Sequence, residues 1–576
     1  MANPFRDIRP PGYQKVAERY RKVIPPDLRQ SAETLAAKPI PPRRPLSTGL
    51  ETYTGTFGED EAAHLLKRTL FGLKKSELRT FAAMSMADAV EAILQSSPIP
   101  TPPVNNYRGY NDRDDPDVPV GDSWIQAPYD VELEGGRVIS LKGWLLKNMT
   151  QQAPTLHEKM ILFWHNLLAI QTWDVFVGKA DYQYFEMLRR NAFGNYKTMV
   201  RDLTLDPAML LFLNGTFNNK EQPDENYARE LQELFTVGKG AGSQYTEADV
   251  SAAARVLTGW VINWEEAEGP GDVSSFFYPN YHDTTDKQFS AFYGNRVIAG
   301  QSGLGGAQEL DELLEMIFDT QEAAKYICRR LYNFFVYPEI DSTTETNVIE
   351  PLAEQFRSGG YEILPVLRTL FKSAHFFDVA NRGAMIKSPI DTLVGLWRTL
   401  GFASPQPDDL SVDLNFYVSA LWNIGGQGQE LGDPPSVAGW PAYYQAPQYD
   451  KSWMTTDTIT KRALITDSLV WWGFWINENL QLPADLIGYL ETLDAPEDPN
   501  AVLMESAQLM LGIALDEASR NELKTILLSG QSSDYYWTDA WTAYQADPSD
   551  SNRTVVENRL KPTLQALMQL GEFQLM

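Results

Sequence analysis

The stretch of residues 61–72, Glu-Ala-Ala-His-Leu-Leu-Lys-Arg-Thr-Leu-Phe-Gly, opens the globular part of the sequence and indicates its fold class. Its apolar residues recur at the three- and four-residue spacing of an amphipathic helix, and Gly72 is a residue type that ends helices. The same spacing returns in most of the segments that follow. The sequence therefore predicts a mainly α-helical protein.

The predicted helices cover most of the chain between residues 138 and 401. They span residues 138–152, 154–173, 178–193, 195–204, 206–212, 224–238, 246–260, 306–319, 321–337, 345–357, 361–373 and 387–401. Strand signals are few, and those at 261–264, 275–278 and 296–299 predict a small β hairpin or ribbon near 260–300. Four or five further helices are expected in 461–576, one of them holding Trp471, Trp472, Phe474 and Trp475. The predicted architecture is a large multi-helical, bundle-like assembly.

Three parts are predicted along the chain. Residues 1–50 form a Pro-rich arm with one helix near 11–21, and the first 46 residues hold ten basic and four acidic side chains. Residues 51–460 form the main helical domain, and residues 461–576 form a helical segment packed on it. We expect the basic arm to wrap the acidic remainder, with docking to a partner or targeting as the alternative.

Composition excludes several classes of function. The 576 residues carry 49 basic and 76 acidic side chains, a formal net charge of −27, which disfavours a nucleic-acid partner. The single cysteine, Cys328, excludes an intramolecular disulfide framework. The sequence has neither a signal peptide nor an apolar run long enough to span a membrane. We therefore expect a cytoplasmic protein without membrane insertion, and the alternative is export as a passenger with a partner.

Three segments are rich in polar residues of types that are rarely buried in a protein core. In the first, residues 157–166, Glu158 and His165 lie two turns apart on one helix face, where they could share a metal or a proton. The alternative is that His165 and Asn166 form a buried hydrogen-bonding pair.

The second segment, residues 223–235, places Asn226, Glu230 and Glu233 on one helix face, with Glu225 and Arg229 paired on another. Its alternative is a solvated face. The third, residues 280–287, holds His282, Asp283 and Lys287 in a loop, where they could orient an imidazole and anchor an anion. Its alternative is a surface turn. The stretch from Gly300 to Gly306 is interpreted as a plain turn.

These segments carry a family resemblance that extends over residues 60–441. The chain resembles the bacterial family called domain of unknown function 1800. The matching residues are Ala62, His64, Leu65, Leu66, Arg68, Phe71 and Gly72; Lys159 and residues 163–166; residues 225–231, 233–236 and Gly238; residues 245–247, Asp249, Val250, Ala254, Arg255 and 257–260; His282, Asp283 and Lys287; residues 387–389, 434–437 and 439–441.

The resemblance implies a mostly helical protein that works with a second, sulfatase-like family, domain of unknown function 1501, which is often encoded beside it. Many members carry export signals, and this chain shows none. The resemblance supplies no established activity.

Because the family motifs coincide with the three polar segments, we expect those segments to converge on one pocket. His165, Glu230, His282, Asp283 and Lys287 are the candidate catalytic residues. A divalent metal held by His165, Glu230 and His282 is one hypothesis for the chemistry. The candidate binding residues are Trp164, Asn166, Asn226, Arg229, Glu233, Arg255 and Trp260.

Two classes of function remain open at this point. The first is a binding or assembly protein of a bacterial export or cell-envelope system that works with a partner protein. The alternative is a hydrolase, metal-assisted or not, that acts on a glycan, sulfated or phosphorylated substrate. A pocket with unpaired polar groups would favour the hydrolase, and full mutual pairing would favour the binding protein.

Overall fold

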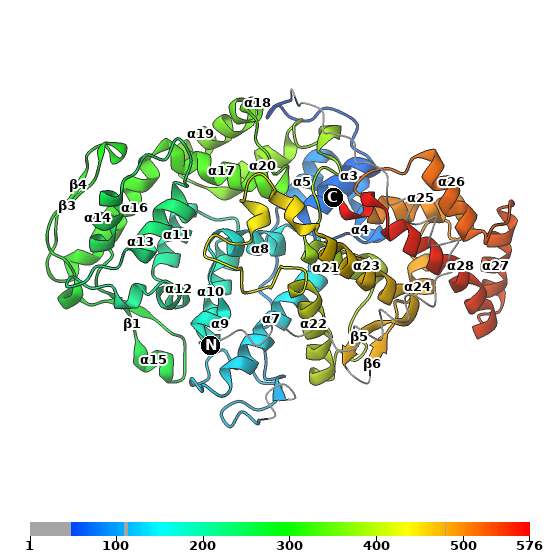
Figure 1. The fold of residues 1–576 in the computed structure, drawn as a ribbon, viewed down its shortest axis with the longest axis horizontal. Helices are drawn as coiled ribbons and strands as arrows, with labels where there is room; N and C mark the ends of the chain where they lie inside the picture. The colour runs from blue at the N-terminus through cyan, green and yellow to red at the C-terminus, as the bar shows by residue number, and fades with distance from the viewer. Residues whose placement is uncertain (1–45, 47, 109–112, 478–479) are drawn as a thin grey trace.

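The computed structural model describes residue 46 and residues 48–108, 113–477 and 480–576. It confirms a mainly α-helical architecture with only short pairs of strands (Figure 1). The helix predicted near 11–21 and most of the predicted arm lie outside the described residues. None of the described helices is both long enough and apolar enough to cross a membrane.

The helices fall into three groups along the chain. The first group is α3 (Glu59–Thr69), α4 (Lys75–Ala82) and α5 (Met86–Ile93). The second is α7 (Glu134–Gln151), α8 (His157–Leu167), α9 (Thr172–Val175), α10 (Gly178–Arg190), α11 (Tyr196–Thr204), α12 (Pro207–Phe212), α13 (Glu225–Glu230), α14 (Glu247–Val256), α15 (Trp264–Glu268), α16 (Glu309–Asp319), α17 (Gln321–Phe335), α18 (Ser342–Thr344), α19 (Glu350–Ser358), α20 (Ile363–Lys372), α21 (Pro389–Leu400) and α22 (Leu410–Gly425). The third is α23 (Thr456–Asp467), α24 (Leu486–Glu491), α25 (Pro499–Met510), α26 (Glu517–Leu527), α27 (Tyr535–Ala546) and α28 (Asp550–Met568).

The strands form three separate antiparallel pairs. β1 (Trp260–Ile262) pairs with β2 (Ser275–Phe277), and β3 (Lys287–Gln288) pairs with β4 (Val297–Ile298), so the strands predicted near 260–300 are present. The third pair, β5 (Phe474–Asn477) with β6 (Leu480–Leu482), lies in a region predicted to be helical.

The aromatic residues 471–475 do not lie in one helix, as the sequence predicted. Trp471 and Trp472 end a π-helical turn, Ser468–Trp472, and Phe474 begins β5. Between them Gly473 has a φ of +95°, and a Cβ there would lie 2.7 Å from the carbonyl carbon of Leu482. A backbone conformation that only glycine adopts readily, together with a close backbone neighbour, turns the chain out of the helix.

The helix predicted over 154–173 is divided into α8 and α9. Asp433, from a distant loop, accepts hydrogen bonds from the Thr172 hydroxyl at 2.8 Å and from the Trp173 amide at 3.0 Å. These two bonds stabilise a new helix start at Thr172, so a tertiary contact overrides the local periodicity.

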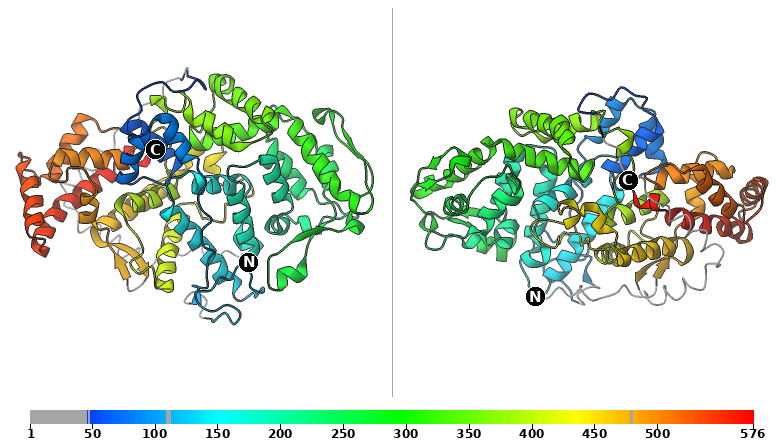
Figure 2. Two further views of the ribbon diagram at one scale, coloured as in Figure 1. Left: turned by 180° about the vertical axis from the view of Figure 1, so that it is seen from behind. Right: turned by 45° about the horizontal axis from the view of Figure 1, so that its top comes forward.

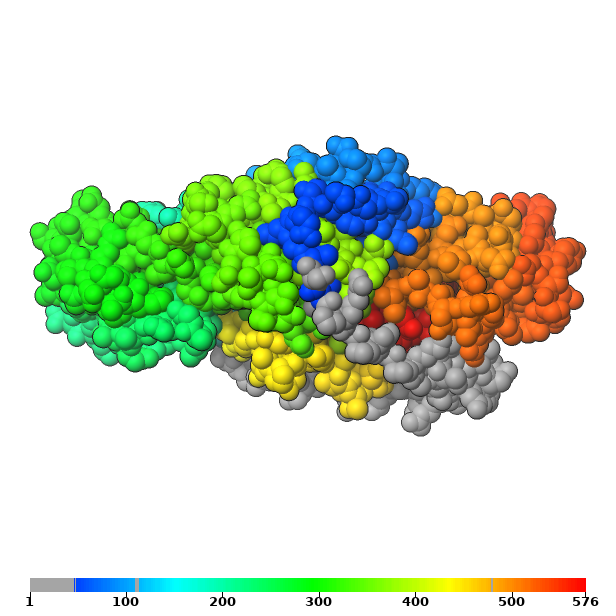
Figure 3. Space-filling view, turned by 90° about the horizontal axis from the view of Figure 1, so that it is seen from above, coloured from blue at the N-terminus to red at the C-terminus, as the bar shows by residue number. Residues whose placement is uncertain are grey.

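The C-terminal end of the chain lies in the middle of the molecule (Figure 1). Figures 1 and 2 show the C-terminus beside α3, with α14 to α16 at one end of the long axis and α26 to α28 at the other. The view from above in Figure 3 shows the same elongated body. Gly72, at a φ of +69°, lets the end of α3 approach α21 so closely that a Cβ would lie 2.4 Å from the Gly395 Cα. The buried apolar residues from Ala62 to Phe573 form one continuous cluster.

Candidate functional site

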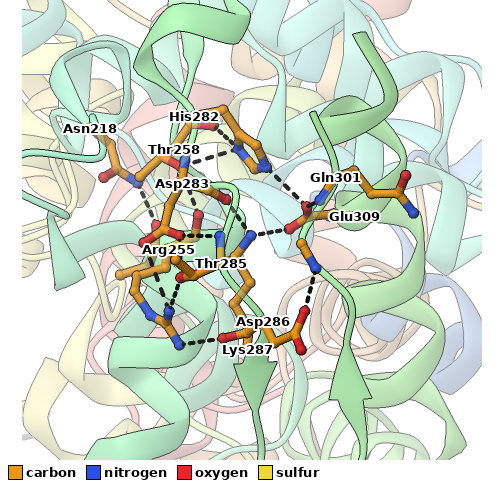
Figure 4. Close-up of polar contacts among 12 residues, drawn as sticks. Asn218, Arg255, Thr258, His282, Asp283, Thr285, Asp286, Lys287, Gln301 and Glu309 are labelled. Carbon is orange, nitrogen blue, oxygen red and sulfur yellow. Dashed lines mark hydrogen bonds and ion pairs between the residues drawn. The ribbon is translucent and has the colours of Figure 1, made fainter. Parts of the chain in front are cut away.

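The third polar segment folds into a buried network between α14, the β3–β4 pair and α16 (Figure 4). A 3₁₀ turn, Pro279–Tyr281, delivers His282, and β3 delivers Lys287. Glu309 is the first residue of α16, where the helix dipole favours a negative charge. His282, Lys287 and Glu309 are each at most 1% exposed.

Glu309 is the centre of this network. Its Oε1 accepts hydrogen bonds from His282 Nε2 at 3.0 Å and from the Gln301 amide at 2.7 Å, and its Oε2 accepts one from Lys287 Nζ at 2.5 Å. Burial raises the pKa of this carboxyl, but the hydrogen bonds from His282 and Lys287 outweigh burial and hold the pKa below its ordinary value. Glu309 is therefore an ionised carboxylate that accepts hydrogen bonds from two buried side chains, His282 and Lys287.

Both ring nitrogens of His282 have partners in the network. Its Nδ1 lies 2.9 Å from the carbonyl oxygen of Thr258 and 3.2 Å from the Thr258 hydroxyl. Its Nε2 lies 3.0 Å from Glu309 Oε1. The ring is therefore held at two points inside the network.

Asp283 and Arg255 complete the network toward the surface. Asp283 Oδ1 accepts from the Thr285 amide at 2.8 Å, and Asp283 Oδ2 lies 3.7 Å from the Arg255 guanidinium. Arg255 also donates to the Thr285 hydroxyl at 2.7 Å. Burial raises the pKa of Asp283. The hydrogen bonds from Thr285 and the charges of Lys287 and Arg255 lower this pKa by more than burial raises it, so the pKa lies below its ordinary value.

A second set of predicted residues lies on α13 and the π-helical turn Leu231–Thr236 that follows it. Asp224 caps α13 by accepting from the Asn226 amide at 2.8 Å. Asn218 joins this cap to α14, because its Oδ1 accepts from the Asp224 amide at 2.9 Å and its Nδ2 donates to the Ala254 carbonyl at 3.0 Å. The second and third segments are thus neighbours through Asn218.

The side chains of the second segment differ in their partners. Arg229 pairs with Glu225 at 3.2 Å, as predicted, and binds Glu247 through both guanidinium nitrogens at 2.9 and 2.6 Å. Glu233 pairs with Lys239 at 2.5 Å. Glu230 is half-buried, and burial together with the charge of Glu233 raises its pKa.

The remaining predicted binding residues of these segments are less involved. Asn226 is exposed, and its side-chain amide reaches only the Leu213 carbonyl, at 3.4 Å. The Trp260 indole packs edge-on against Phe277 with ring centroids 5.2 Å apart. Its Nε1 is buried and has no hydrogen-bond partner among the residues that the structure describes.

The first segment lies elsewhere, inside the helical core. His165 is fully buried against Tyr184, Phe185 and Trp440, and its Nδ1 lies 3.2 Å from the Tyr184 hydroxyl. That hydroxyl donates to the Leu168 carbonyl at 2.8 Å, so it accepts from His165 and the proton of the imidazole sits on Nδ1. Burial lowers the pKa of His165 to about 3.

The neighbours of His165 are equally buried. Asn166 Oδ1 accepts from the Trp440 amide at 2.9 Å, and Trp164 Nε1 donates to the Ala192 carbonyl at 3.1 Å. Both side chains join helices to loops within the core. They match the alternative interpretation of this segment, a hydrogen-bonding pair that fixes tertiary contacts.

The metal triad expected from the sequence is not assembled. The described part of the chain contains no group of three or more His, Cys, Asp or Glu side chains placed to hold a metal ion. The contacts of His165 are with the core residues around Trp440, whereas His282 already donates to Glu309 beside an ammonium group. The three segments therefore lie in two places. The second and third segments are neighbours at one end of the molecule, and the first lies separately in the helical core.

Comparison with protein families identifies the family of this chain. The family model described as "Protein of unknown function (DUF1800)" matches residues 64–575. The chain belongs to this family. Neither curated proteins nor solved structures give a match.

The DUF1800 match continues past residue 441, where the resemblance noted from the sequence ends. The structure also adds Glu309 to the network of His282 and Lys287. Glu309 was overlooked because it lies in an acidic first turn that resembles a solvated helix start. The signal for it is the glycine-rich loop before α16, which was interpreted as a plain turn. A Cβ on Gly306 would lie 2.5 Å from His282 Cδ2, and one on Gly300 would lie 2.1 Å from the Thr284 carbonyl oxygen. These glycines allow the loop to close over the network.

Proposed function

We propose that this chain is a binding or assembly protein of a bacterial cell-envelope or export system, and that it works with a partner protein. The observation that supports this proposal is the mutual pairing of the polar motif residues. His282 and Lys287 are buried and hydrogen-bond to Glu309, Thr258 and Asp283, so their polar atoms are engaged within the protein. Buried and satisfied networks of this kind give a fold rigidity and a unique geometry.

A second buried pair supports the same interpretation. Lys159, on α8, forms an ion pair with Asp391, on α21, and both side chains are at most 6% exposed. Asp391 also caps α21 together with Ser388, whose hydroxyl donates to it at 2.8 Å. Lys159 and Ser388 belong to family motifs, and here too their polar atoms join helices to one another.

The experiment is co-expression with a sulfatase-like protein of the DUF1501 family, the partner family that the resemblance implies. We expect the two proteins to purify together and to sediment as one species. Fractionation of the producing cells then distinguishes export with the partner from a cytoplasmic complex. Two proteins that separate fully at micromolar concentration would contradict the proposal.

The alternative is a hydrolase that acts on a glycan, sulfated or phosphorylated substrate. One observation favours it. Glu230 and Glu233 are two nearby carboxylates in different environments, because Lys239 pairs with Glu233 whereas burial and the charge of Glu233 raise the pKa of Glu230. A carboxyl group of raised pKa beside a second carboxylate is the arrangement of the acid and base in glycosidases.

This alternative is tested with chromogenic glycoside, sulfate-ester and phosphate-ester substrates, each with and without divalent metal ions. Turnover that is lost in Glu230→Gln and retained in Glu225→Gln would support a hydrolase. Glu225 is the matched control because it is a neighbouring carboxylate already paired with Arg229. Absence of turnover on every substrate class would favour the binding protein.

A further inference from the structure

Exposed aromatic side chains gather on one end of the molecule. Among the described residues, the exposed ones are Phe217, Trp264, Phe276, Tyr278, Tyr281, Tyr535 and Tyr536. The first five form what we call the aromatic surface. They belong to the β1–β2 pair and the short helices beside it, at the end where Figure 1 shows β1 and α15.

Hydrogen bonds and ring contacts place these five side chains on adjoining strips. The 3₁₀ turn Gly215–Phe217 lies along β1, because the Thr216 hydroxyl accepts from the Ile262 amide at 3.0 Å. From this turn the Phe217 ring meets the Trp264 ring with centroids 6.3 Å apart.

The other three aromatic residues continue across β2. Phe276 lies opposite Val261, and Tyr278, two residues further along the chain, points to the same face. The rings of Tyr278 and Tyr281 are 4.8 Å apart. Leu304, from the 3₁₀ helix Gly303–Gln308 that contacts this turn, is 74% exposed.

Most charged side chains around the aromatic surface are acidic. Residues 259–284 contain no Lys or Arg, and they contain Glu265, Glu266, Glu268, Asp272 and Asp283, of which Asp283 pairs with Arg255. The exposed Lys220 lies beside this surface, since its backbone amide donates to the Tyr281 carbonyl at 2.7 Å, so the acidic side chains outnumber the basic ones there. Glu265 and Glu268 are exposed, and neither has an ion-pair partner in the part of the chain that the structure describes. A partner that covers the aromatic rings would bring its own charges close to these carboxylates.

We propose that the aromatic surface docks a partner protein that presents apolar side chains flanked by Lys or Arg. Exposed Trp, Tyr and Phe side chains are the residues that dominate protein interfaces, and opposite charges at the rim orient the encounter. An anionic membrane would be repelled by the acidic rim. A neutral glycan can stack on aromatic rings, but it carries no positive charge to match the acidic side chains.

This inference rests on the proposed function, since it names the surface and the chemistry of the partner. The test uses three fluorescent twelve-residue peptides. One has a Leu/Trp core with Lys/Arg flanks, one has the same core with Glu flanks, and one has Lys/Arg flanks around a Ser/Gly core. We expect only the first to bind, and its binding to weaken as salt is raised.

The variants locate the binding. The Phe217→Ala/Trp264→Ala double variant is expected to weaken binding of the first peptide at least about tenfold, because loss of interface hot spots has effects of this size. The matched control is Tyr535→Ala/Tyr536→Ala, which removes the other exposed aromatic pair, from α27, and is expected to leave binding unchanged. Both pairs are exposed, so neither change disturbs the core.

Several results would overturn the inference. They are equal binding of the three peptides, no binding of any of them, or equal weakening by the control variant. Binding of phosphatidylglycerol vesicles or of a β-glucan oligosaccharide that the double variant abolishes would assign the surface to another ligand. Self-association that it abolishes would assign the surface to a second copy.

A failure of the inference can be told apart from a failure of the proposed function. If the DUF1501-family partner purifies equally with wild type and with the Phe217→Ala/Trp264→Ala variant, the aromatic surface is not the docking site, and the proposed function stands. If wild type does not purify with that partner but binds the first peptide through the aromatic surface, the surface is supported and the proposed function fails.

Discussion

Lowering the pH from 7.5 to 5.0 is expected to destabilise the protein through His165. This imidazole lies in the core, its Nε2 has no hydrogen-bond partner in the described part of the chain, and burial lowers its pKa to about 3. In the unfolded chain a histidine has a pKa of about 6.5. Between these two values the unfolded state binds more protons than the folded state, so stability rises with pH in this window and is lost as the pH falls through it.

The magnitude follows from the two pKa values. A pH of 5.0 lies about 1.5 units below the pKa of the histidine in the unfolded chain, which is therefore mostly protonated. In the folded protein the same histidine is still neutral at this pH. Each unit corresponds to about 1.4 kcal/mol, so His165 contributes a loss of about 2 kcal/mol at pH 5.0 relative to high pH. Burial also lowers the pKa values of His64 and His157, which adds to the loss. Burial raises the pKa values of Asp206 and Asp467 to about 7, so these carboxyls stabilise the folded protein as the pH falls over the same range, and the His165 effect must be isolated by comparison with variants.

The assay separates His165 from the other two histidines. Urea unfolding followed by tryptophan fluorescence is compared for wild type and for His165→Phe and His165→Gln at pH 7.5, 6.5, 5.5 and 5.0. Each substitution has its own fixed cost, but the difference from wild type should shrink by about 2 kcal/mol between pH 7.5 and 5.0. A difference that stays constant over this range in both variants would refute the claim that His165 is held neutral.

Three further substitutions test other parts of the structure by the same unfolding assay. Glu309→Ala is expected to cost about 3–5 kcal/mol, because it leaves the buried Lys287 ammonium uncompensated; a cost under about 1 kcal/mol would contradict the buried network. Gly439→Ala is expected to cost at least about 2 kcal/mol, since φ there is +87° and a Cβ would lie 2.1 Å from the Asn166 carbonyl oxygen; an unchanged midpoint would argue against this close approach. Arg229→Ala should leave the midpoint unchanged, because its ion pairs are at the surface and screened by solvent, and a clear loss would show that they are structural.

Local sequence signals predicted the elements of the fold well where neighbouring residues decide them. The periodicity of 61–72 predicted α3, because that helix depends on interactions within one or two turns. The strands near 260–300 were also found. The prediction of one helix across 471–475 was wrong. The chain leaves the helix at Gly473, where it lies against the backbone of Leu482 and Pro483, which that helix does not contain.

The candidate site was predicted only in part for the same reason. The sequence identified His282, Asp283 and Lys287 as a group because they are adjacent in the chain, and they do lie together. It could not identify Glu309 as their acceptor, since 22 residues separate it from Lys287. It also could not separate His165 from the others, because polar residue types alone do not tell which of them share a neighbourhood.

The sequence by itself determined the helical class, the acidic charge and the polar segments that the family shares. These properties depend on composition and on spacing over a few residues, which every conformation of the chain retains. Only the tertiary structure decided which polar groups neutralise one another, because burial and pairing depend on contacts between distant residues. That arrangement made His165 a neutral core residue, enclosed His282 with Glu309, and left Phe217 and Trp264 exposed on an acidic surface.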